Sequence, residues 1–267
     1  MNNLAVISGN GSFPFYFLKE VKKRGADCIV VALKGETNPD IEKLGFPVFW
    51  CNIGKLNTLI SLMKNNKISR AIMCGQVVHT KLFTEIKLDL RAVKLLSSLK
   101  NKKTDSILSA VADELEKEGI KLISSLTFMQ DWLPDKKGLL TNNKLSKAIY
   151  SDIDFGYQTA KAIAKLDIGQ TVVVKNNAVV AVESLEGTDQ CILRGYDLVG
   201  EGIVVVKVNK PDQDIRFDVP VIGGKTFEIL KKVKASAIAF ESGKTLFFDI
   251  KECLEIAEKN NIGVYAI

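Results

Sequence analysis

The fold of the first half of this chain is decided by residues 4–25, LAVISGNGSFPFYFLKEVKKRG. The apolar run of residues 4–8 predicts a buried strand. Residues 14–24 predict a helix with Pro14 in its first turn and Gly25 just past its end, which is the usual placement of these two residues. A strand, a glycine turn and a helix in this order are typical of a nucleotide-binding α/β unit.

The turn between this strand and this helix contains Gly9, Asn10 and Gly11. Glycine lets backbone N–H groups approach an anion, and the helix N-terminus adds donors and partial positive charge. We therefore predict that these three residues bind a phosphate-bearing ligand, with a plain tight turn as the alternative. Pro14 occupies the place of the third glycine in the dinucleotide fingerprint, which weakens a second alternative, a Rossmann-type oxidoreductase.

The rest of the first half alternates apolar strand runs with helical segments. The pair Gly75-Gln76 follows the apolar run of residues 70–74, at the carboxyl end of a predicted strand. Parallel sheets place ligands at such ends, so we predict that this pair also contacts the substrate. We expect Thr104 to cap a helix that Gly119 closes. The predicted strands are residues 28–33, 70–74 and 120–124, and the predicted helices are residues 56–64, 88–99 and 104–118. This alternation predicts a Rossmann-like parallel sheet covered by helices on both faces.

A polar stretch with Pro, Gly and Asn at residues 132–146 predicts a domain boundary, with one domain at 1–133 and the other at 134–267. After it, the pattern mixes hairpins with helices and predicts a smaller α+β domain. Asn176-Asn177 should form a tight hairpin turn, because Asn tolerates left-handed backbone angles. The expected helices are 146–165, 224–232 and 250–259, and the expected strands are 171–175, 178–183, 202–208, 237–241, 245–248 and 263–267.

Composition narrows the class of protein. The 267 residues include 46% hydrophobic and 25% charged residues, which is typical of a globular protein that needs no disulfide or structural metal. The five cysteines are scattered, and His79 is the only histidine, so a zinc site is disfavoured. The sequence shows no signal-peptide pattern, so we expect a cytoplasmic protein. A net charge of +6 without interleaved aromatic residues argues against nucleic-acid binding.

Two loops of the second half mix carboxylates with cations. They span residues 182–189 and 207–220. Pyrophosphate hydrolysis needs this mixture, because carboxylates hold Mg²⁺ and orient water while Lys and Arg neutralise phosphoryl charge. A solvated charged loop is the alternative, and composition alone favours it. The candidate residues in these loops are Thr188, Asp189, Lys207, Asp214, Arg216 and Asp218.

Several strings along the chain carry a resemblance to one family. They are GNGSFP (9–14), AVADELEKEG (110–119), LDIGQTVVVK (166–175), AVESLEGTD (181–189), KPDQDIRFDVP (210–220) and ESGKT (241–245). In this order and over the whole chain they resemble the LpxI-type UDP-2,3-diacylglucosamine pyrophosphatases. Residues 75–77 and 125–128 are local variants of the family's strings.

The resemblance implies a dimeric enzyme of lipid A biosynthesis with a lipid-linked UDP-sugar substrate. It implies attack of water on the sugar-side phosphorus with Mg²⁺, releasing UMP and 2,3-diacylglucosamine 1-phosphate, at an active site between the two domains. The family's essential aspartate matches Asp218, with Asp214 and Asp189 as neighbours. We expect Asp218 and Asp214 to bind Mg²⁺ or orient the water.

Further expectations concern the remaining residues and partners. Lys207 and Arg216 should stabilise the developing charge, and the turn of residues 9–11 should contact the uridine diphosphate. The Leu- and Lys-rich segment 85–103 either covers the first domain or lies on the inner membrane surface. A non-catalytic nucleotide-sugar-binding module remains the alternative function.

Overall fold

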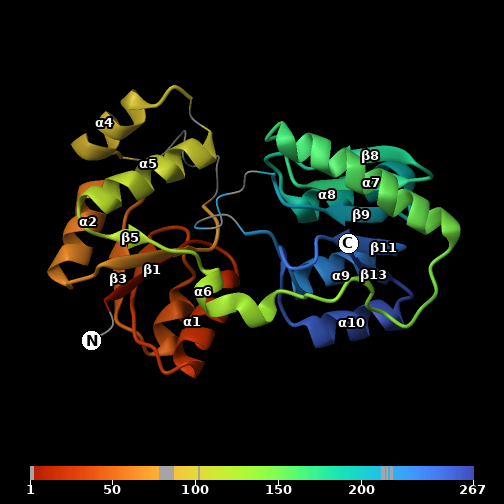
Figure 1. The fold of residues 1–267 in the computed structure, drawn as a ribbon, viewed down its shortest axis with the longest axis horizontal. Coiled ribbons are helices and arrows are strands. Elements are labelled where there is room, and N and C mark those ends of the chain that lie inside the picture. Colours follow the sequence, from red (N-terminus) through yellow and green to blue (C-terminus); the bar gives the residue numbers. More distant parts are fainter. Residues whose placement is uncertain (1–2, 78–86, 102, 212–213, 215, 217–218) are drawn as a thin grey trace. The chain divides into compact units, whose positions relative to one another are not determined.

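The structure is a computed structural model that describes residues 3–77, 87–101, 103–211, 214, 216 and 219–267. The chain forms two compact units (Figure 1). Unit 1 comprises Met1–Gln130 and Asp214–Asp218, and unit 2 comprises Asp131–Gln213 and Val219–Ile267. The predicted division into a nucleotide-binding domain at 1–133 and a catalytic domain at 134–267 stays a prediction. None of the described helices has the length and apolar character needed to cross a bilayer.

In the described part of unit 1, five strands form one parallel sheet in the order β3-β2-β1-β4-β5. They are β1 (Leu4–Ser8), β2 (Ile29–Leu33), β3 (Val48–Cys51), β4 (Arg70–Cys74) and β5 (Lys121–Leu122). β1 is buried throughout, and three of the five residues in each of its neighbours β2 and β4 are buried, as expected for a sheet covered on both faces. The strand order reverses between β1 and β4, which makes the carboxyl ends of these two strands the expected ligand-binding position.

Helices cover both faces of this sheet. They are α1 (Phe13–Lys23), the 3₁₀ helix η1 (Pro39–Leu44), α2 (Leu56–Asn65), α4 (Leu90–Ser98), α5 (Thr104–Lys117) and α6 (Leu126–Met129), with the short η2 (Gln130–Trp132) after them. On one face, Ile60 and Met63 of α2 and Leu115 of α5 pack with strand residues in one core cluster. α1 packs against α6 and η1, and the rings of Phe17 and Phe128 meet edge to face with centroids 5.5 Å apart.

Unit 2 has a mixed six-stranded sheet in its described residues, in the order β6-β13-β11-β9-β7-β8. The strands are β6 (Gly138–Leu139), β7 (Thr171–Lys175), β8 (Ala178–Val182), β9 (Val204–Lys207), β11 (Ala237–Phe240) and β13 (Gly263–Ala266). β9, β11 and β13 run parallel, while β6, β7 and β8 pair antiparallel. A separate parallel pair joins β10 (Val221–Ile222) to β12 (Leu246–Phe247).

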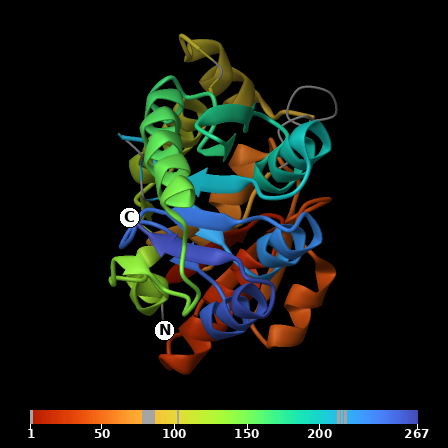
Figure 2. The ribbon, with the colours of Figure 1, turned by 90° about the vertical axis from the view of Figure 1, so that its right-hand side faces the viewer.

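The helices of unit 2 also lie on both faces of its sheet (Figure 2). They are α7 (Lys147–Lys165), α8 (Thr188–Val199), α9 (Gly224–Lys232) and α10 (Ile250–Lys259). Alternate strand residues face α7 on one side, as Val206 does, and α8 to α10 on the other, as Val205 does. Gly156 of α7 allows close packing, because a Cβ there would lie 2.6 Å from a methyl group of Val206.

The predicted fold class is confirmed, with corrections of detail. Asn176 and Asn177 have φ angles of 52° and 55° and form the predicted hairpin turn. Thr104 is the first residue of α5 rather than its cap, because Lys103 holds the N-cap position. The sequence pattern also failed to predict α8. In addition, α9 and α10 connect parallel strands, so the centre of unit 2 is itself an α/β arrangement.

Candidate functional site

In unit 1, the two loops predicted to bind a ligand lie against each other at the carboxyl ends of β1 and β4. The Gly9 N–H donates to the Cys74 carbonyl oxygen over 2.8 Å. Asn10 and Gln76 form a reciprocal backbone bridge, with N···O distances of 2.6 Å from Asn10 to Gln76 and 3.0 Å in return. The structure therefore brings the predicted residues Gly9, Asn10, Gly75 and Gln76 together at the position where the strand order reverses.

These two loops approach so closely that both need glycine. A Cβ on Gly9 would lie 2.5 Å from the Gln76 carbonyl oxygen, and a Cβ on Gly75 would lie 2.5 Å from the Asn10 carbonyl oxygen. The Gly11 N–H donates to the Asn10 side-chain oxygen over 2.6 Å. The backbone N–H groups of Gly9, Asn10 and Gly11, which were predicted to hold a diphosphate, thus donate to acceptors within the protein. A ligand would have to replace these acceptors. Their role in phosphate binding stays a prediction.

In unit 2, the predicted residue Lys207 ends β9 and is held at the carboxyl edge of the parallel strands. Its Nζ donates to the Thr188 hydroxyl oxygen and to the Val221 carbonyl oxygen, each over 3.0 Å. An ammonium group carries three N–H donors, one more than these two bonds use. The structure thus joins two predicted residues, Lys207 and Thr188, and orients a half-buried positive charge.

The Thr188 hydroxyl links Lys207 to a carboxylate. It donates to Glu183 Oε1 over 2.9 Å while it accepts from Lys207, and it lies 3.2 Å from the Thr171 hydroxyl. Glu183 also accepts the Gln170 N–H over 3.3 Å. Thr171 begins β7 and Thr188 begins α8, while Glu183 directly follows β8 and Lys207 ends β9. Sequence reasoning placed Glu183 in a charged loop but did not single it out.

Asp189 lies in the first turn of α8, where a carboxylate is favoured by the helix dipole. Its two oxygens face the start of α9: Oδ2 lies 2.9 Å from Lys225 Nζ, and Oδ1 accepts the Thr226 hydroxyl over 3.1 Å. Lys225 is mostly exposed and can exchange this partner for another anion. The contact connects two helix N-termini in unit 2, and sequence reasoning assigned no site role to Lys225 or Thr226.

Asp214 and Arg216, which were predicted as site residues, bind each other. Arg216 Nε lies 3.0 Å from both carboxylate oxygens, and Nη2 lies 2.6 Å from Oδ2. The Arg216 backbone N–H also donates to Asp214 Oδ1 over 3.0 Å. The guanidinium of Arg216 lowers the pKa of Asp214 from its ordinary value, and the carboxylate raises the pKa of Arg216. Asp214 is therefore ionised at neutral pH, with Arg216 as its partner.

The predicted essential residue, Asp218, lies outside the described residues. In the part of the chain that the structure does describe, no group of three or more His, Cys, Asp or Glu side chains is placed to hold a metal ion. The predicted metal site of Asp218 and Asp214 thus stays a prediction.

A second charged cluster in unit 2 was not predicted. Glu241 follows β11, and both its oxygens accept from Lys161 Nζ of α7, at 3.1 and 3.3 Å. Lys161 Nζ also donates to the Asn209 carbonyl oxygen over 2.9 Å, and the Asn209 N–H donates to Glu241 Oε2 over 2.6 Å. Lys244 Nζ lies 3.4 Å from Glu241 Oε1. The cluster fixes the start of the loop that leaves β9.

Burial and hydrogen bonding act in opposite directions on Glu241. Burial raises its pKa, but the Asn209 N–H and the Lys161 ammonium lower it by more, so the pKa lies below the ordinary value. Among the described residues, two buried atoms of this region, Asn209 Oδ1 and Thr245 Oγ1, have no hydrogen-bond partner. The sequence signal for the cluster was a glutamate directly after the apolar run AIAF.

The cysteines lie in the interior of the protein. All five are buried and free. Burial raises the pKa of Cys28, Cys191 and Cys253 to about 12, so these thiols stay protonated at neutral pH.

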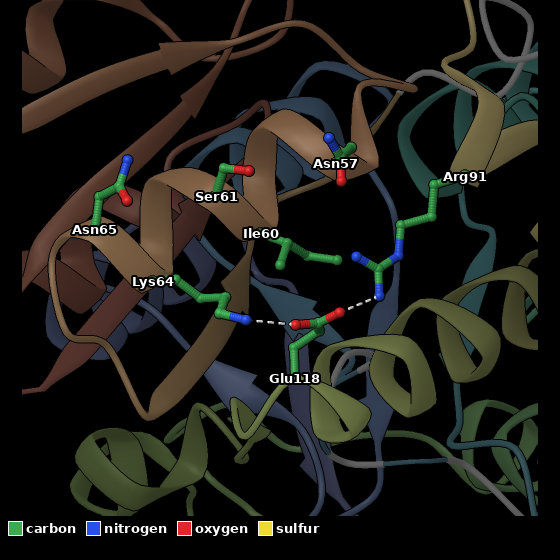
Figure 3. Close-up of a pocket in the computed structure, with 7 residues that line it drawn as sticks. All are labelled: Asn57, Ile60, Ser61, Lys64, Asn65, Arg91 and Glu118. Carbon is green, nitrogen blue, oxygen red and sulfur yellow. Dashed lines mark hydrogen bonds and ion pairs between the residues drawn. The ribbon is translucent and has the colours of Figure 1, made fainter.

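A surface pocket of about 340 Å³ lies between α2, α4 and the end of α5 in unit 1 (Figure 3). Its lining is mainly polar, and Glu118 accepts from Lys64 over 2.7 Å and from Arg91. These two hydrogen bonds lower the pKa of Glu118 to about 2. The pocket contains none of the predicted site residues, and its charges already pair with each other. It is lined by Asn57, Ile60, Ser61, Lys64, Asn65, Arg91 and Glu118.

The fold and these clusters define a two-unit α/β protein with polar groups at the carboxyl edges of both parallel arrangements. The chain belongs to the LpxI family, since residues 3–132 match the LpxI N-terminal domain and residues 136–265 match the LpxI C-terminal domain. It is 29% identical over 280 positions to the UDP-2,3-diacylglucosamine pyrophosphatase LpxI of Caulobacter vibrioides, covering 100% of this chain and 97% of that protein.

Solved structures with some similarity include two biotin carboxylases. The biotin carboxylase subunit of pyruvate carboxylase is 13% identical with a TM-score of 0.30, over 75% of this chain and 43% of that one. The biotin carboxylase domain of a thermophilic 2-oxoglutarate carboxylase is 12% identical with a TM-score of 0.29, over 65% of this chain and 35% of that one. This chain thus spans less than half the length of either solved chain.

Proposed function

We propose that this protein hydrolyses the pyrophosphate of UDP-2,3-diacylglucosamine to UMP and 2,3-diacylglucosamine 1-phosphate (lipid X) in lipid A biosynthesis. The observation that carries this proposal is the relationship along the whole chain. Both LpxI domains match in order, and a pyrophosphatase of the family aligns with 100% of the chain. A shared fold alone would not support a shared reaction, whereas a match that includes the site-bearing loops does.

We propose that Lys207 binds the substrate's diphosphate. Its ammonium is already held by Thr188 and by the Val221 carbonyl, so little reorganisation is needed when negative charge develops on the phosphoryl oxygens. Glu183 accepts from the Thr188 hydroxyl and fixes the direction in which that hydroxyl presents its lone pairs to Lys207. Lys225, mostly exposed beside Asp189, is a further cation that can turn toward an anionic ligand.

We propose Mg²⁺ as the cofactor, held by Asp218 and Asp214. Mg²⁺ usually takes one or two carboxylates together with substrate phosphates, so two aspartates are a sufficient protein contribution. The described member of this pair, Asp214, fits as one oxygen ligand, because its hydrogen-bonded partner Arg216 keeps it ionised. When bound, the ion would neutralise charge on the phosphoryl oxygens. Arg216, released from Asp214, would then be able to bind a phosphate oxygen.

We also propose a homodimer in the cytoplasm that contacts the inner membrane peripherally. The family resemblance supports the dimer. The membrane contact is supported by the substrate, since a diacylated sugar nucleotide resides in a bilayer with its head group in water.

The test is turnover of UDP-2,3-diacylglucosamine with Mg²⁺ in detergent micelles, followed by the release of UMP. In ¹⁸O-labelled water we expect the label in the phosphate of lipid X, because attack on the sugar-side phosphorus leaves UMP unlabelled. Label in UMP would contradict the proposed direction of attack.

The alternative, a non-catalytic nucleotide-sugar-binding module, is not favoured, because the relative that aligns over the whole chain is a pyrophosphatase. The same experiment separates the two. Tight substrate binding without any UMP under these conditions would establish the binding module and contradict hydrolysis.

A further inference from the structure

The outward face of α4 in unit 1 carries apolar side chains that the fold does not bury. Leu90 is 91% exposed and Val93 is 47% exposed, while Leu88, just before the helix, is 38% exposed. The opposite side of α4 is packed, since Ala92 is 6% exposed and belongs to a core cluster. Figure 1 shows α4 on the outer side of α5 within unit 1. α4 therefore covers the core with one face and presents a second apolar stripe outward.

This stripe is not needed for the helix itself. α4 is started by Asp89, whose carboxylate accepts the N–H groups of Ala92 over 2.9 Å and of Asn57 over 2.8 Å. Leu90 and Val93 are three residues apart and so lie next to each other on the helix surface. Polar residues in place of Leu90 and Val93 would cost the helix little stability. Two adjacent exposed apolar residues on a helix that Asp89 already caps therefore point to a contact with another molecule.

The charge around this stripe is positive. Lys87, Lys94 and Lys100 are all exposed. Glu114 and Glu118 pair with Arg91 of α4, and Asp89 accepts the two backbone N–H groups. We call Leu88, Leu90, Val93, Lys87, Lys94 and Lys100 the α4 surface.

We propose that the α4 surface docks on an anionic phospholipid bilayer. Apolar side chains flanked by lysines are what an interfacial helix needs, because the leucines enter the acyl boundary and the lysines meet anionic head groups. A second copy of the same surface is a poorer occupant, since it would bring like-charged lysines together. The inference rests on the proposed function only in that a lipid-linked substrate gives the protein a reason to reach a membrane.

The test is co-sedimentation of the full-length protein with vesicles. Vesicles of phosphatidylethanolamine and phosphatidylglycerol supply anionic head groups, and vesicles of phosphatidylcholine are the neutral comparison. We expect binding to the anionic vesicles only, weakening as salt is raised because exposed charges are screened. Equal binding to the two vesicle types would overturn the proposal.

Two variants assign the binding to the α4 surface. Leu90→Gln should weaken vesicle binding about tenfold, as expected when a leucine can no longer be buried. Lys94→Gln should weaken it about fivefold through one lost contact with anionic lipid. The matched controls lie in unit 2: Leu198→Gln on α8, where the leucine is 64% exposed, and Lys251→Gln on α10, where the lysine is exposed. Both controls should bind like the parent.

Several results would overturn the proposal. One is unchanged vesicle binding by Leu90→Gln and Lys94→Gln, and another is an equal loss of vesicle binding by the two control variants. A third is a change in the oligomeric state of Leu90→Gln in solution, which would assign the surface to a second copy. Unfolding midpoints equal to the parent's confirm that the variants are folded. A soluble substrate with short acyl chains should be hydrolysed equally by parent and Leu90→Gln. Vesicle binding is measured without turnover, so an inactive parent would contradict the proposed function and leave this inference to be judged on binding alone.

Discussion

Replacing Lys161 by Met should destabilise unit 2 by stranding a buried carboxylate. Lys161 Nζ binds both oxygens of Glu241, whose side chain is only 6% exposed. Removing one partner of a buried ion pair costs about 3–5 kcal/mol. Lys161 is 26% exposed, and Lys244 lies 3.4 Å from the same carboxylate, so both its own hydration and this second cation reduce the cost. We expect a loss of about 2–3 kcal/mol.

The pH dependence identifies the cause. In the parent the pKa of Glu241 is lowered, so its contribution to stability is present above the unfolded pKa of about 4.3 and is lost as the pH falls through the lower folded pKa. Without Lys161, burial dominates and the pKa of Glu241 rises. The variant can then relieve the stranded charge by protonation as the pH falls toward about 4. Its deficit relative to the parent should therefore be largest at pH 7 and smaller at pH 4.

The assay is thermal unfolding of the full chain at both pH values. At roughly 3–4 °C per kcal/mol for a unit of this size, the midpoint at pH 7 should fall by about 6–12 °C. Lys161→Met combined with Glu241→Gln should recover part of the loss, because no charge is left unpaired. Lys234→Met, which breaks an exposed 2.6 Å pair with Glu201, is the control and should leave the midpoint unchanged. A deficit that is equal at both pH values, or a double variant whose loss is the sum of the single losses, would refute this reasoning.

Three further predictions concern the candidate site. Lys207→Met should lower kcat about 10²–10³-fold, as expected for the loss of a fixed charge at a developing oxyanion. The control is Lys175→Met, which removes an ammonium that donates to two carbonyl oxygens at 2.7 and 2.8 Å, and this variant should turn over normally. Equal kcat values for the two variants would exclude Lys207 from catalysis. Gly75→Ala should lower the free energy of unfolding by about 2–4 kcal/mol in chemical denaturation, because the new Cβ meets a carbonyl oxygen and the φ angle is +90°. Gly11→Ala, which has open space around the new Cβ, should lower it by only about 1–2 kcal/mol. Similar losses would show that close approach of the two loops is not the constraint. Asp218→Ala should abolish turnover but retain the unfolding midpoint and substrate binding, and chelation of divalent metal by EDTA should stop the parent reversibly; near-normal turnover by the variant would remove this residue from the mechanism.

Local sequence chemistry was sufficient for most elements of the fold. The predicted bounds of β1, β4, α9 and α10 coincide with those in the structure, because each element is an apolar or periodic run with a clear boundary. The Asn176-Asn177 turn formed as predicted, since its backbone requires two left-handed residues in succession and Asn accepts that conformation.

Elements that depend on tertiary packing were missed. α8 begins after Gly187 and contains Gly195, so its intrinsic helix propensity is weak. A Cβ at Gly195 would lie 2.7 Å from a methyl group of Val173, which shows that the glycine serves the packing of α8 on the sheet. The edge strand β3 was missed as well, and three of its four residues are only half-buried in the structure.

The sequence by itself determined the two-part α/β organisation, the glycine turn after the first strand, and which loops carry charge, because periodicity, turn residues and capping are local properties of the chain. Only the tertiary structure decided which charges meet. Lys207 reaches Thr188, and Lys161 reaches Glu241, across segments that are far apart in sequence and become neighbours through the order of strands in the sheet. Residue type indicates that a buried charge needs a partner, but the partner is chosen by which strands and helices pack together.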